Sequence, residues 1–393
     1  MSGALKRDEW ETVRLGDVCD VVSGSTPKTA NLEYWDGDIL WITPAELNED
    51  SHYIYDTTRK ITEAGRDSAS LTLLPQGTVL LSSRAPIGKV GIVGTEMCCN
   101  QGFKNLVCSP VIFNNYLFWF LKGKTAYLNS LGRGATFKEI SKGIVESIQI
   151  PLPPLDIQRQ IADTLDKVTE LITLRKTQLE KLDELVKARF VEMFGDPVLN
   201  PYNWDVVTIG DIVTDVKYGT SKPAVDGGKY PYLRMNNLTY DGHLDLSDMK
   251  YIDIPDNEIE KCIVRKGDVL FNRTNSIELV GKTCVFDLDD EMVIAGYIIR
   301  VRLNEKLLPI VLSSYMNSTV LKEQLRNMAK GAVNQANINA QELQSIKIYL
   351  PPLELQEQFA TFVEQTDKSK VTIQQSLDTL ETLKKSLMQE YFG

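Results

Sequence analysis

The sequence has no long hydrophobic run. Nowhere in its 393 residues do apolar side chains approach the roughly 20 consecutive positions that a membrane-spanning helix needs. The first eight residues, Met1 to Asp8, lead into charged side chains and not into the apolar core of a secretion signal. We therefore expect a cytoplasmic protein without a membrane partner.

Cysteine is also scarce, with six in the whole chain. The cysteines form neither the dense framework of a disulfide-stapled domain nor a CxxC pair with a second ligand pair. We expect reduced thiols, most of them packed in the core. They are Cys19, Cys98, Cys99, Cys108, Cys262 and Cys284.

Candidate metal ligands are few, because the chain has only two histidines, His52 and His243. In the sequence, both lie far from any set of cysteines or carboxylates with the spacing of a zinc site. The adjacent Cys98 and Cys99 could not comfortably chelate one ion together. The sequence therefore predicts no metal and no cofactor in this chain.

Three segments partly match sequence motifs of enzymes, and each match is incomplete. Residues 200–202, Asn-Pro-Tyr, are similar to the Asn-Pro-Pro-aromatic loop of amino-methyltransferases but lack its second proline. Residues 281–283, Gly-Lys-Thr, resemble the end of a phosphate-binding loop, but Ser276 replaces that loop's first glycine. The acidic segment 255–261 lacks the acidic-x-Lys triplet of nucleases, which favours a solvated loop. We expect no catalytic residue.

The net charge of −10 argues, taken alone, against a nucleic-acid partner, because DNA binding depends on lysine and arginine meeting phosphates. The charges are unevenly distributed, however. Residues 1–69 carry 7 basic and 14 acidic side chains, whereas residues 70–142 carry 8 basic side chains against Glu96 and Glu139 alone. One face of the first half is thus predicted to be basic, although solvated charges that merely segregate along the chain would give the same count.

What the chain does contain is an internal duplication. Residues 153–160, Pro-Pro-Leu-Asp-Ile-Gln-Arg-Gln, return as residues 351–358, Pro-Pro-Leu-Glu-Leu-Gln-Glu-Gln, at a shift of 198 (351 minus 153). Phe194-Gly195 returns as Phe392-Gly393 at the same shift. Upstream the correspondence is looser, at shifts of 190 to 197. Each half is therefore a variable head followed by a well-matched segment.

The matched segment is predicted to be a long helix, from about residue 156 to 193 in the first copy. Pro153-Pro154 can precede a helix but cannot continue one, and Asp156 supplies a carboxylate for the helix N-terminus. Apolar residues then recur at alternating steps of four and three, which is the pattern of a coiled-coil seam. The seam residues are Ile161, Leu165, Val168, Ile172, Leu179, Leu182 and Val186 in the first copy and Phe359, Val363, Ile373, Leu377, Leu380 and Leu387 in the second.

A helix of this length spans about 55 Å at ~1.5 Å per residue. Its apolar seam is unfavourable in water. We expect the two helices to pack on each other, antiparallel, because each follows its own head and the chain must return. This arrangement would be pseudo-two-fold, with two heads and a paired spacer. In the alternative, each helix buries its seam against its own head.

The heads are predicted to be mixed α/β. Residues 77–83 and 268–272 combine apolar and β-branched side chains between turn signals, which favours strands, and helices are expected at 114–129 and 309–328. The fold class is therefore α+β multidomain, with two heads alternating with two long helices. The predicted boundaries are 1–152 for the first head, 153–198 for its helix, 199–350 for the second head and 351–393 for its helix.

Three successive features are repeated once along the chain: a glycine loop at Gly134-Ala135-Thr136, a short strand at 148–151, and Pro-Pro-Leu-x-x-Gln opening a long helix. This order resembles the specificity subunit of type I restriction-modification enzymes, and the resemblance covers essentially the whole chain. The second copy departs from the first at Gly331-Ala332-Val333, where it lacks the threonine hydroxyl.

In that family, two target-recognition domains alternate with two helical regions. The resemblance implies that each head reads one half of a split, asymmetric sequence in double-stranded DNA and that the paired helices set the distance between the halves. It also implies two docked methyltransferase subunits, which carry S-adenosylmethionine, and restriction (translocase) subunits that join them. This chain would itself be non-catalytic.

Contacts with DNA are expected from polar and basic residues that follow predicted strands, because arginine and lysine suit guanine whereas asparagine and glutamine suit adenine. Residues at the glycine loops are expected to meet phosphates. Each residue taken singly could equally be an ordinary surface or turn residue. The predicted contacts are Ser83, Arg84, Lys89, Gln101, Lys104, Arg133 and Lys138 in the first head and Arg234, Asn236, Asn237, Asn272, Arg273, Asn275, Lys282, Lys330, Asn334 and Gln335 in the second.

Two other interpretations fit the duplication. A two-headed protein or glycan adaptor with a coiled-coil spacer would not bind DNA, whereas a DNA reader would bind and lose affinity steeply with added salt. A free-standing enzyme would transfer methyl groups without partners, but the incomplete motifs argue against it.

Overall fold

The computed structural model describes residues 10–134, 138–332 and 335–393, and in addition gives no side-chain placement for 330–332 and 335. The chain divides into two compact units. Unit 1 comprises Met1–Arg175 with Ser376–Gly393, and unit 2 comprises Lys176–Gln375. Each long helix is thus divided between the two units. The boundaries predicted from the sequence instead treat each helix as one separate segment.

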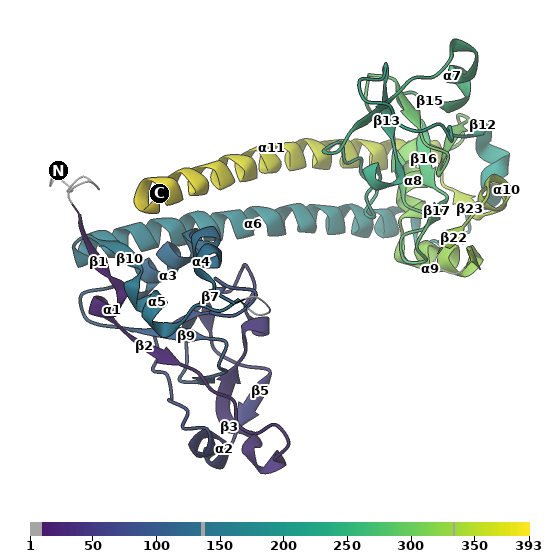
Figure 1. The fold of residues 1–393 in the computed structure, drawn as a ribbon. Helices are drawn as coiled ribbons and strands as arrows, with labels where there is room; N and C mark the ends of the chain where they lie inside the picture. The colour runs from purple at the N-terminus through teal and green to yellow at the C-terminus, as the bar shows by residue number, and fades with distance from the viewer. Residues whose placement is uncertain (1–9, 135–137, 333–334) are drawn as a thin grey trace. The chain divides into compact units, whose positions relative to one another are not determined.

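Unit 1 contains two sheets beside a two-stranded pairing of β1 with β10, which joins the beginning of the head to its end (Figure 1). The larger sheet has the strand order β2-β9-β6-β7-β4, and the smaller has the order β5-β3-β8. The strands are β1 (Glu11–Arg14), β2 (Cys19–Ser23), β3 (Trp35–Ile42), β4 (Tyr53–Ile54), β5 (Arg59–Ile61), β6 (Val79–Leu81), β7 (Val90–Val93), β8 (Cys98–Cys99), β9 (Lys104–Cys108) and β10 (Gln149–Leu152). The helices are α1 (Leu15–Val18), α2 (Glu63–Ser68), α3 (Asn114–Gly123), α4 (Thr125–Leu131) and α5 (Lys142–Ser147), with single 3-10 turns at Leu32–Tyr34 and Pro44–Glu46.

Unit 2 repeats this plan. β11 pairs with β23 as β1 pairs with β10, and the sheet order β12-β20-β16-β18 corresponds to β2-β9-β6-β7. The strands are β11 (Asp205–Thr208), β12 (Val213–Tyr218), β13 (Tyr230–Leu233), β14 (Lys250–Ile252), β15 (Ile263–Val264), β16 (Val269–Asn272), β17 (Thr274–Asn275), β18 (Thr283–Val285), β19 (Met292–Ile294), β20 (Ile298–Leu303), β21 (Lys330–Ala332), β22 (Gln335–Asn337) and β23 (Lys347–Leu350). The helices are α7 (Asp256–Cys262), α8 (Pro309–Met316), α9 (Thr319–Met328) and α10 (Ala340–Gln344), with 3-10 turns at Ile209–Ile212 and Met235–Asn237.

The predicted helix at 309–328 is divided into α8 and α9, and the one at 114–129 into α3 and α4. In the second head the break has a local cause. The hydroxyl of Ser318 accepts a hydrogen bond from the backbone N–H of Leu321, so Ser318 caps a new helix where the previous one ends. Periodicity over the whole window did not reveal this cap.

The two long helices are α6 (Leu155–Phe194) and α11 (Leu353–Phe392), each 40 residues long, as the seam pattern predicts (Figure 1). In unit 1, Ile161 and Leu165 from the beginning of α6 share a core cluster with Phe392 from the end of α11. In unit 2, the ring centroids of Phe194, at the end of α6, and Phe359, near the beginning of α11, are 5.3 Å apart. In both units the helices therefore pair with opposite direction, as expected.

Every predicted seam residue is buried or half-buried. The four at the beginning of α6, Ile161 to Ile172, are buried, as are Phe359, Val363 and Leu377 in α11. Two seam positions of α11 hold lysine instead. Lys370 lies 2.5 Å from Asp183 of α6 in unit 2, and Lys384 lies 5.0 Å above the ring of Trp119 in unit 1. At both of these positions, the charge of the lysine therefore has a defined partner.

The glutamine that ends each Pro-Pro-Leu-x-x-Gln motif fixes a long helix to its head. Gln158 is fully buried; its Nε2 donates to the carbonyls of Val111 and Pro153, and its Oε1 accepts from the N–H of Phe113 at 2.8 Å. Gln356 makes the same three bonds in unit 2, to Lys306, Pro351 and Leu308. The repeated motif therefore conserves one internal joint.

We expect Gln158→Met to destabilise unit 1 by about 2 kcal/mol, because a side chain of similar size leaves buried backbone groups without partners. Gln356→Met should do the same to unit 2. Hydrogen exchange at the backbone amides of Phe113 and Leu308 would report each loss separately. The exposed Gln160→Met, two residues further along α6, is the control. Equal exchange in Gln158→Met and Gln160→Met would contradict the assignment.

Within the described ranges, no helix combines the length and the apolar composition required to cross a bilayer.

Candidate nucleic-acid interface

A polar edge forms in unit 1 where three separate segments meet: residues 82–84, 100–104 and 133–140. The N–H of Ser83 donates to the carbonyl of Gly102 at 2.7 Å, and the N–H of Ile140 donates to the carbonyl of Ser83 at 2.9 Å. Arg133 and Glu139 exchange two backbone hydrogen bonds of 3.0 Å, which close the base of the glycine loop. Residues 135–137 of that loop lie outside the described residues. We call this surface the first polar edge.

Glu139 organises the charges of the first polar edge. Its carboxylate accepts from Arg84 Nε at 2.9 Å and from Lys104 Nζ at 3.1 Å. Partial burial acts to raise the pKa of Glu139, but the hydrogen bonds from Lys104 and Arg84 outweigh it and lower the pKa. The carboxylate is therefore ionised at neutral pH and holds both cations at the base of the loop.

The predicted contact residues of the first head divide into two groups. Ser83 is buried and donates to the carbonyl of Gly102, and Lys104 is 7% exposed. Lys89 Nζ donates to the carbonyls of Pro44, at 3.1 Å, and Leu47. These three residues make internal contacts in the first head. The exposed group is Arg84, Gln101, Arg133 and Lys138.

The expected basic face of residues 70–142 is correspondingly smaller than the sequence suggests, because Lys89, Lys104 and Lys122 make internal contacts. Lys122 Nζ donates to the carbonyl of Glu49 at 2.6 Å and lies 5.0 Å above the ring of Phe118. Composition counts charges, but it does not show which ones the fold has already used.

Unit 2 builds a second polar edge from the corresponding segments, residues 272–275, 295–298 and 330–338. The N–H of Arg273 donates to the carbonyl of Tyr297, and the N–H of Ile338 donates to the carbonyl of Arg273, both at 2.9 Å. These bonds match those of Ser83 with Gly102 and Ile140, so Arg273 occupies the place of Ser83. Its guanidinium lies 5.0 Å above the ring of Tyr218. Two edges with one backbone plan thus carry different side chains.

Three predicted contacts in the second head are buried, with exposed fractions of 8% or less. Asn272 donates to the carbonyls of Thr274 and Tyr297, and Asn237 donates to the carbonyl of Asp245 at 2.8 Å. Burial lowers the pKa of Lys282. In this conformation Asn272 and Asn237 use their amide donors on backbone carbonyls and Lys282 is buried, which argues against direct contact of these side chains with a base.

The remaining predicted residues of the second head differ in accessibility. Asn236 is exposed, and Arg273 and Asn275 are half-buried. Arg234 is half-buried and pairs with Asp248 at 2.8 Å. Asn334 lies outside the described residues, and the side chains of Lys330 and Gln335 are not described.

A glycine in each head shapes the same turn, which the sequence interpretation missed. A Cβ on Gly24 would lie 2.1 Å from the carbonyl oxygen of Asn100, and one on Gly219 would lie 2.2 Å from that of Ile294. Both glycines therefore allow a close backbone approach beside a polar edge. The recurrence of Gly24 as Gly219 could have indicated this turn, since a segment with several valines precedes each glycine.

A family model supplies the deciding comparison. The model described as the type I restriction modification DNA specificity domain matches residues 7–184 and again residues 201–383. The chain belongs to the type I restriction-modification specificity family. As a specificity subunit, it acts in DNA recognition and not in catalysis.

Curated relatives carry the same description. The EcoKI specificity subunit of Escherichia coli K12 is 24% identical, over 100% of this chain and 90% of its own. The MjaIX specificity subunit of Methanocaldococcus jannaschii is 34% identical, over 63% of this chain and 62% of its own, so the alignment spans just under two thirds of that relative.

Solved structures show the same fold. The S subunit from M. genitalium has a TM-score of 0.59 at 15% identity, covering 100% of this chain and 97% of that one. A chain from a study of complex assembly and conformational transition in the type I R-M system has a TM-score of 0.62 at 21% identity, covering 98% and 97%.

The motif similar to a methyltransferase loop has a structural role in this specificity subunit. Asn200 Nδ2 donates to the carbonyl of Trp204 at 2.8 Å, and Asn200 Oδ1 accepts from the N–H of Trp204 at 3.0 Å. The amide group thus holds the turn after α6. In the phosphate-loop-like triplet, Thr283 donates to the carbonyl of Gly281 at 3.1 Å, and Lys282 is buried.

The histidines require a correction, because the fold brings both of them close to carboxylates. His52 Nε2 lies 4.0 Å from Asp166, and His243 Nε2 lies 3.5 Å from Asp183. Within the described ranges, Asp183, Asp241 and His243 form the one group with the geometry of a metal site. The ammonium of Lys370 lies 2.5 Å from the Asp183 Oδ1, however, so a positive charge already occupies the place of a cation.

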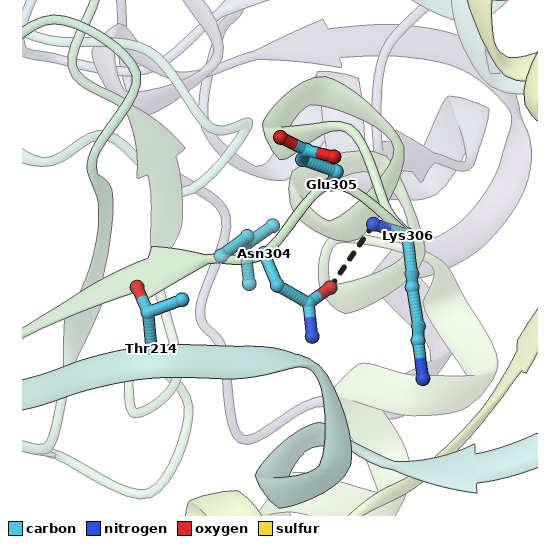
Figure 2. A pocket seen from close by; sticks show the side chains of 5 residues that line it. Thr214, Asn304, Glu305 and Lys306 are labelled. Atoms are coloured by element: carbon cyan, nitrogen blue, oxygen red, sulfur yellow. Dashed lines mark hydrogen bonds between the residues drawn. The ribbon is translucent and has the colours of Figure 1, made fainter.

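A surface hollow in unit 2 is lined by Thr214, Leu303, Asn304, Glu305 and Lys306 (Figure 2). Asn304 Oδ1 accepts from the backbone N–H of Lys306 at 3.0 Å, and the Thr214 hydroxyl donates to the carbonyl of Arg302. Among these five residues, the one hydroxyl is that of Thr214, and it donates its hydrogen bond to a backbone carbonyl and not to a basic side chain.

Proposed function

We propose that each unit reads one half of a bipartite, asymmetric sequence in double-stranded DNA and that its polar edge makes the base contacts. The observation that carries this proposal is the repeated backbone plan of the two edges. The bonds that fix Ser83 in unit 1 fix Arg273 in unit 2, so the same frame presents different side chains. Two such frames suit two different half-sites.

We propose that the predicted residues that are exposed or half-buried contact bases and phosphates. Lys330, Asn334 and Gln335, whose exposure is not described, are kept from the sequence prediction. Arginine can bind guanine with two hydrogen bonds, and asparagine or glutamine can do the same with adenine. Buried members such as Asn272 and Lys104 instead hold the frame. The proposed contacts are Arg84, Gln101, Arg133 and Lys138 in unit 1 and Arg234, Asn236, Arg273, Asn275, Lys330, Asn334 and Gln335 in unit 2.

The long helices are proposed to pair as an antiparallel coiled coil that sets the spacing between half-sites and docks two methyltransferase subunits. Support comes from the burial of the seam and from the contribution of each helix to the core of both units. S-adenosylmethionine would belong to the methyltransferase partners, and restriction (translocase) subunits would join that core. Asn200, which holds its own turn, fits this division of labour.

The spacing role can be tested by inserting one heptad into the middle of both α6 and α11. Seven residues lengthen a helix by about 10 Å and keep the seam in register. We expect the complex with its methyltransferase to modify sites whose spacer is longer by about 3 base pairs, at ~3.4 Å each. Sequencing of methylated adenines would show the new spacer with unchanged half-sites.

The control for that experiment is a heptad in α6 alone, which leaves the opposing helix too short and should abolish modification. Methylation at the original spacing by the doubly extended chain would contradict the spacing role. Loss of half-site identity would instead show that the helices contribute to reading.

A further inference from the structure

Two cysteines that are far apart in the sequence face each other in unit 1. Cys19 on β2 and Cys108 on β9 are direct register partners in an antiparallel pairing. The next pair along, Val18 and Ser109, is hydrogen-bonded, because the N–H of Ser109 donates to the carbonyl of Val18 at 3.0 Å. Pairs alternate in such a ladder, so Cys19 and Cys108 form a non-hydrogen-bonded pair, for which the Cα atoms are about 4.5 Å apart.

This geometry suits a covalent bond between the two sulfurs. Disulfides span Cα separations of roughly 4.4 to 6.8 Å, and directly opposite residues on a sheet point to the same face. Cys19 is 6% exposed, whereas Cys108 is half-buried, so a small reagent can reach the second sulfur first.

We propose that Cys19 and Cys108 are an oxidation site at which a peroxide converts two thiols into one intramolecular disulfide. In the first step the Cys108 sulfur attacks the peroxide O–O bond, which gives a sulfenic acid and water. In the second step the Cys19 sulfur attacks the Cys108 sulfur and releases a second water. Two thiols and one hydrogen peroxide thus become one disulfide and two waters.

The roles of the two sulfurs follow from their surroundings. The hydrogen bond with Cys108 and burial raise the pKa of Cys19, so Cys19 is a poor first nucleophile for peroxide in solution. Once Cys108 is oxidised, its neighbour needs no diffusion to reach it. Cys19 therefore resolves an intermediate that forms at Cys108.

The other cysteines have different surroundings. Cys98 and Cys99 are neighbours on one strand, so their side chains point to opposite faces. Cys99 accepts a hydrogen bond from Asn105, and Cys262 donates to carbonyls of its own helix. Cys284 is fully buried in unit 2.

The disulfide would close a loop from residue 19 to residue 108, which contains most of the strands of unit 1. Closing such a loop restricts the unfolded chain and stabilises the folded one. The first polar edge lies at the opposite end of the same ladder, where Ser23 pairs with Lys104, four residues and about 13 Å away. Oxidation should therefore stabilise unit 1 without changing DNA affinity.

The test treats the full chain with a small excess of hydrogen peroxide and maps its peptides without reduction. We expect a Cys19–Cys108 cross-linked peptide in most molecules and a melting temperature of unit 1 raised by about 5 °C. Dithiothreitol should reverse both changes. DNA affinity in a mobility-shift titration should stay within about twofold.

Cys108→Ser should lose both the cross-link and the temperature shift, whereas Cys98→Ser should keep them. Peptide mapping of the unmutated chain decides the matter even if Cys108→Ser folds poorly. Accumulation of Cys108 sulfinic acid without a cross-link would overturn the proposal, and so would cross-links that join other cysteines or two chains.

Discussion

Replacing Phe392 by alanine is expected to destabilise unit 1 by about 3 kcal/mol or more, while unit 2 keeps its stability. Phe392 is 3% exposed and packs in the head core, with ring centroids 5.3 Å from Tyr116 and 5.8 Å from Phe120. Truncation removes a large apolar side chain and leaves a cavity among these rings. Hydrogen exchange resolved by peptide would report the two units separately.

The duplication provides a matched pair for this experiment. Phe194→Ala should destabilise unit 2 by a similar amount, because Phe194 is fully buried against Phe190 and Phe359. Leu383→Ala, at a side chain of α11 that is 43% exposed, is the control and should change stability by no more than about 0.5 kcal/mol. If Phe392→Ala behaves like Leu383→Ala, the end of α11 does not belong to the core of unit 1.

Arg273→Ala is expected to weaken binding to the cognate DNA site by about tenfold or more and to leave assembly with the methyltransferase unchanged. Tyr218 supports the guanidinium from one side, and the carbonyl of Tyr297 fixes the backbone, so the arginine is held in place before DNA arrives. A mobility-shift titration at several salt concentrations would measure both the affinity and the salt slope.

Two further variants separate the possible roles of this arginine. Arg273→Lys keeps the charge but loses the planar fork, so a base contact would remain impaired while a phosphate contact would be restored. Arg265→Ala removes a half-buried arginine of the same unit that is already paired with Glu260 and Glu291, and this variant should bind DNA normally. Unchanged affinity in Arg273→Ala would remove this residue from the interface.

The long helices and the duplication could be predicted because they depend on periodicity and identity along the chain. The seam from Ile161 to Val186 follows the helical repeat, and a segment with such a seam is compatible with few structures other than a helix. Side-chain roles at the polar edges could not be predicted in the same way. Asn272 ends one strand and Asn236 follows another, yet the first is buried in backbone hydrogen bonds and the second is exposed.

The count of basic residues was a misleading guide to the basic face for a similar reason. Lys89 and Lys104 count as basic in any composition, but one donates to backbone carbonyls and the other is held by Glu139. The carboxylate partners of His52 and His243 are more than 50 residues away along the chain, so no local spacing could indicate them. Contacts of this kind depend on which strands become neighbours.

The sequence by itself determined that two similar halves each end in a long amphipathic helix, because repeated residues and apolar periodicity are properties of the chain. It also determined the family, through the motifs that both halves share. Only the tertiary structure decided which polar residues remain accessible, where Glu139 places its two cations and that Cys19 meets Cys108. These outcomes depend on strand pairing and burial, which bring together residues that no local pattern connects.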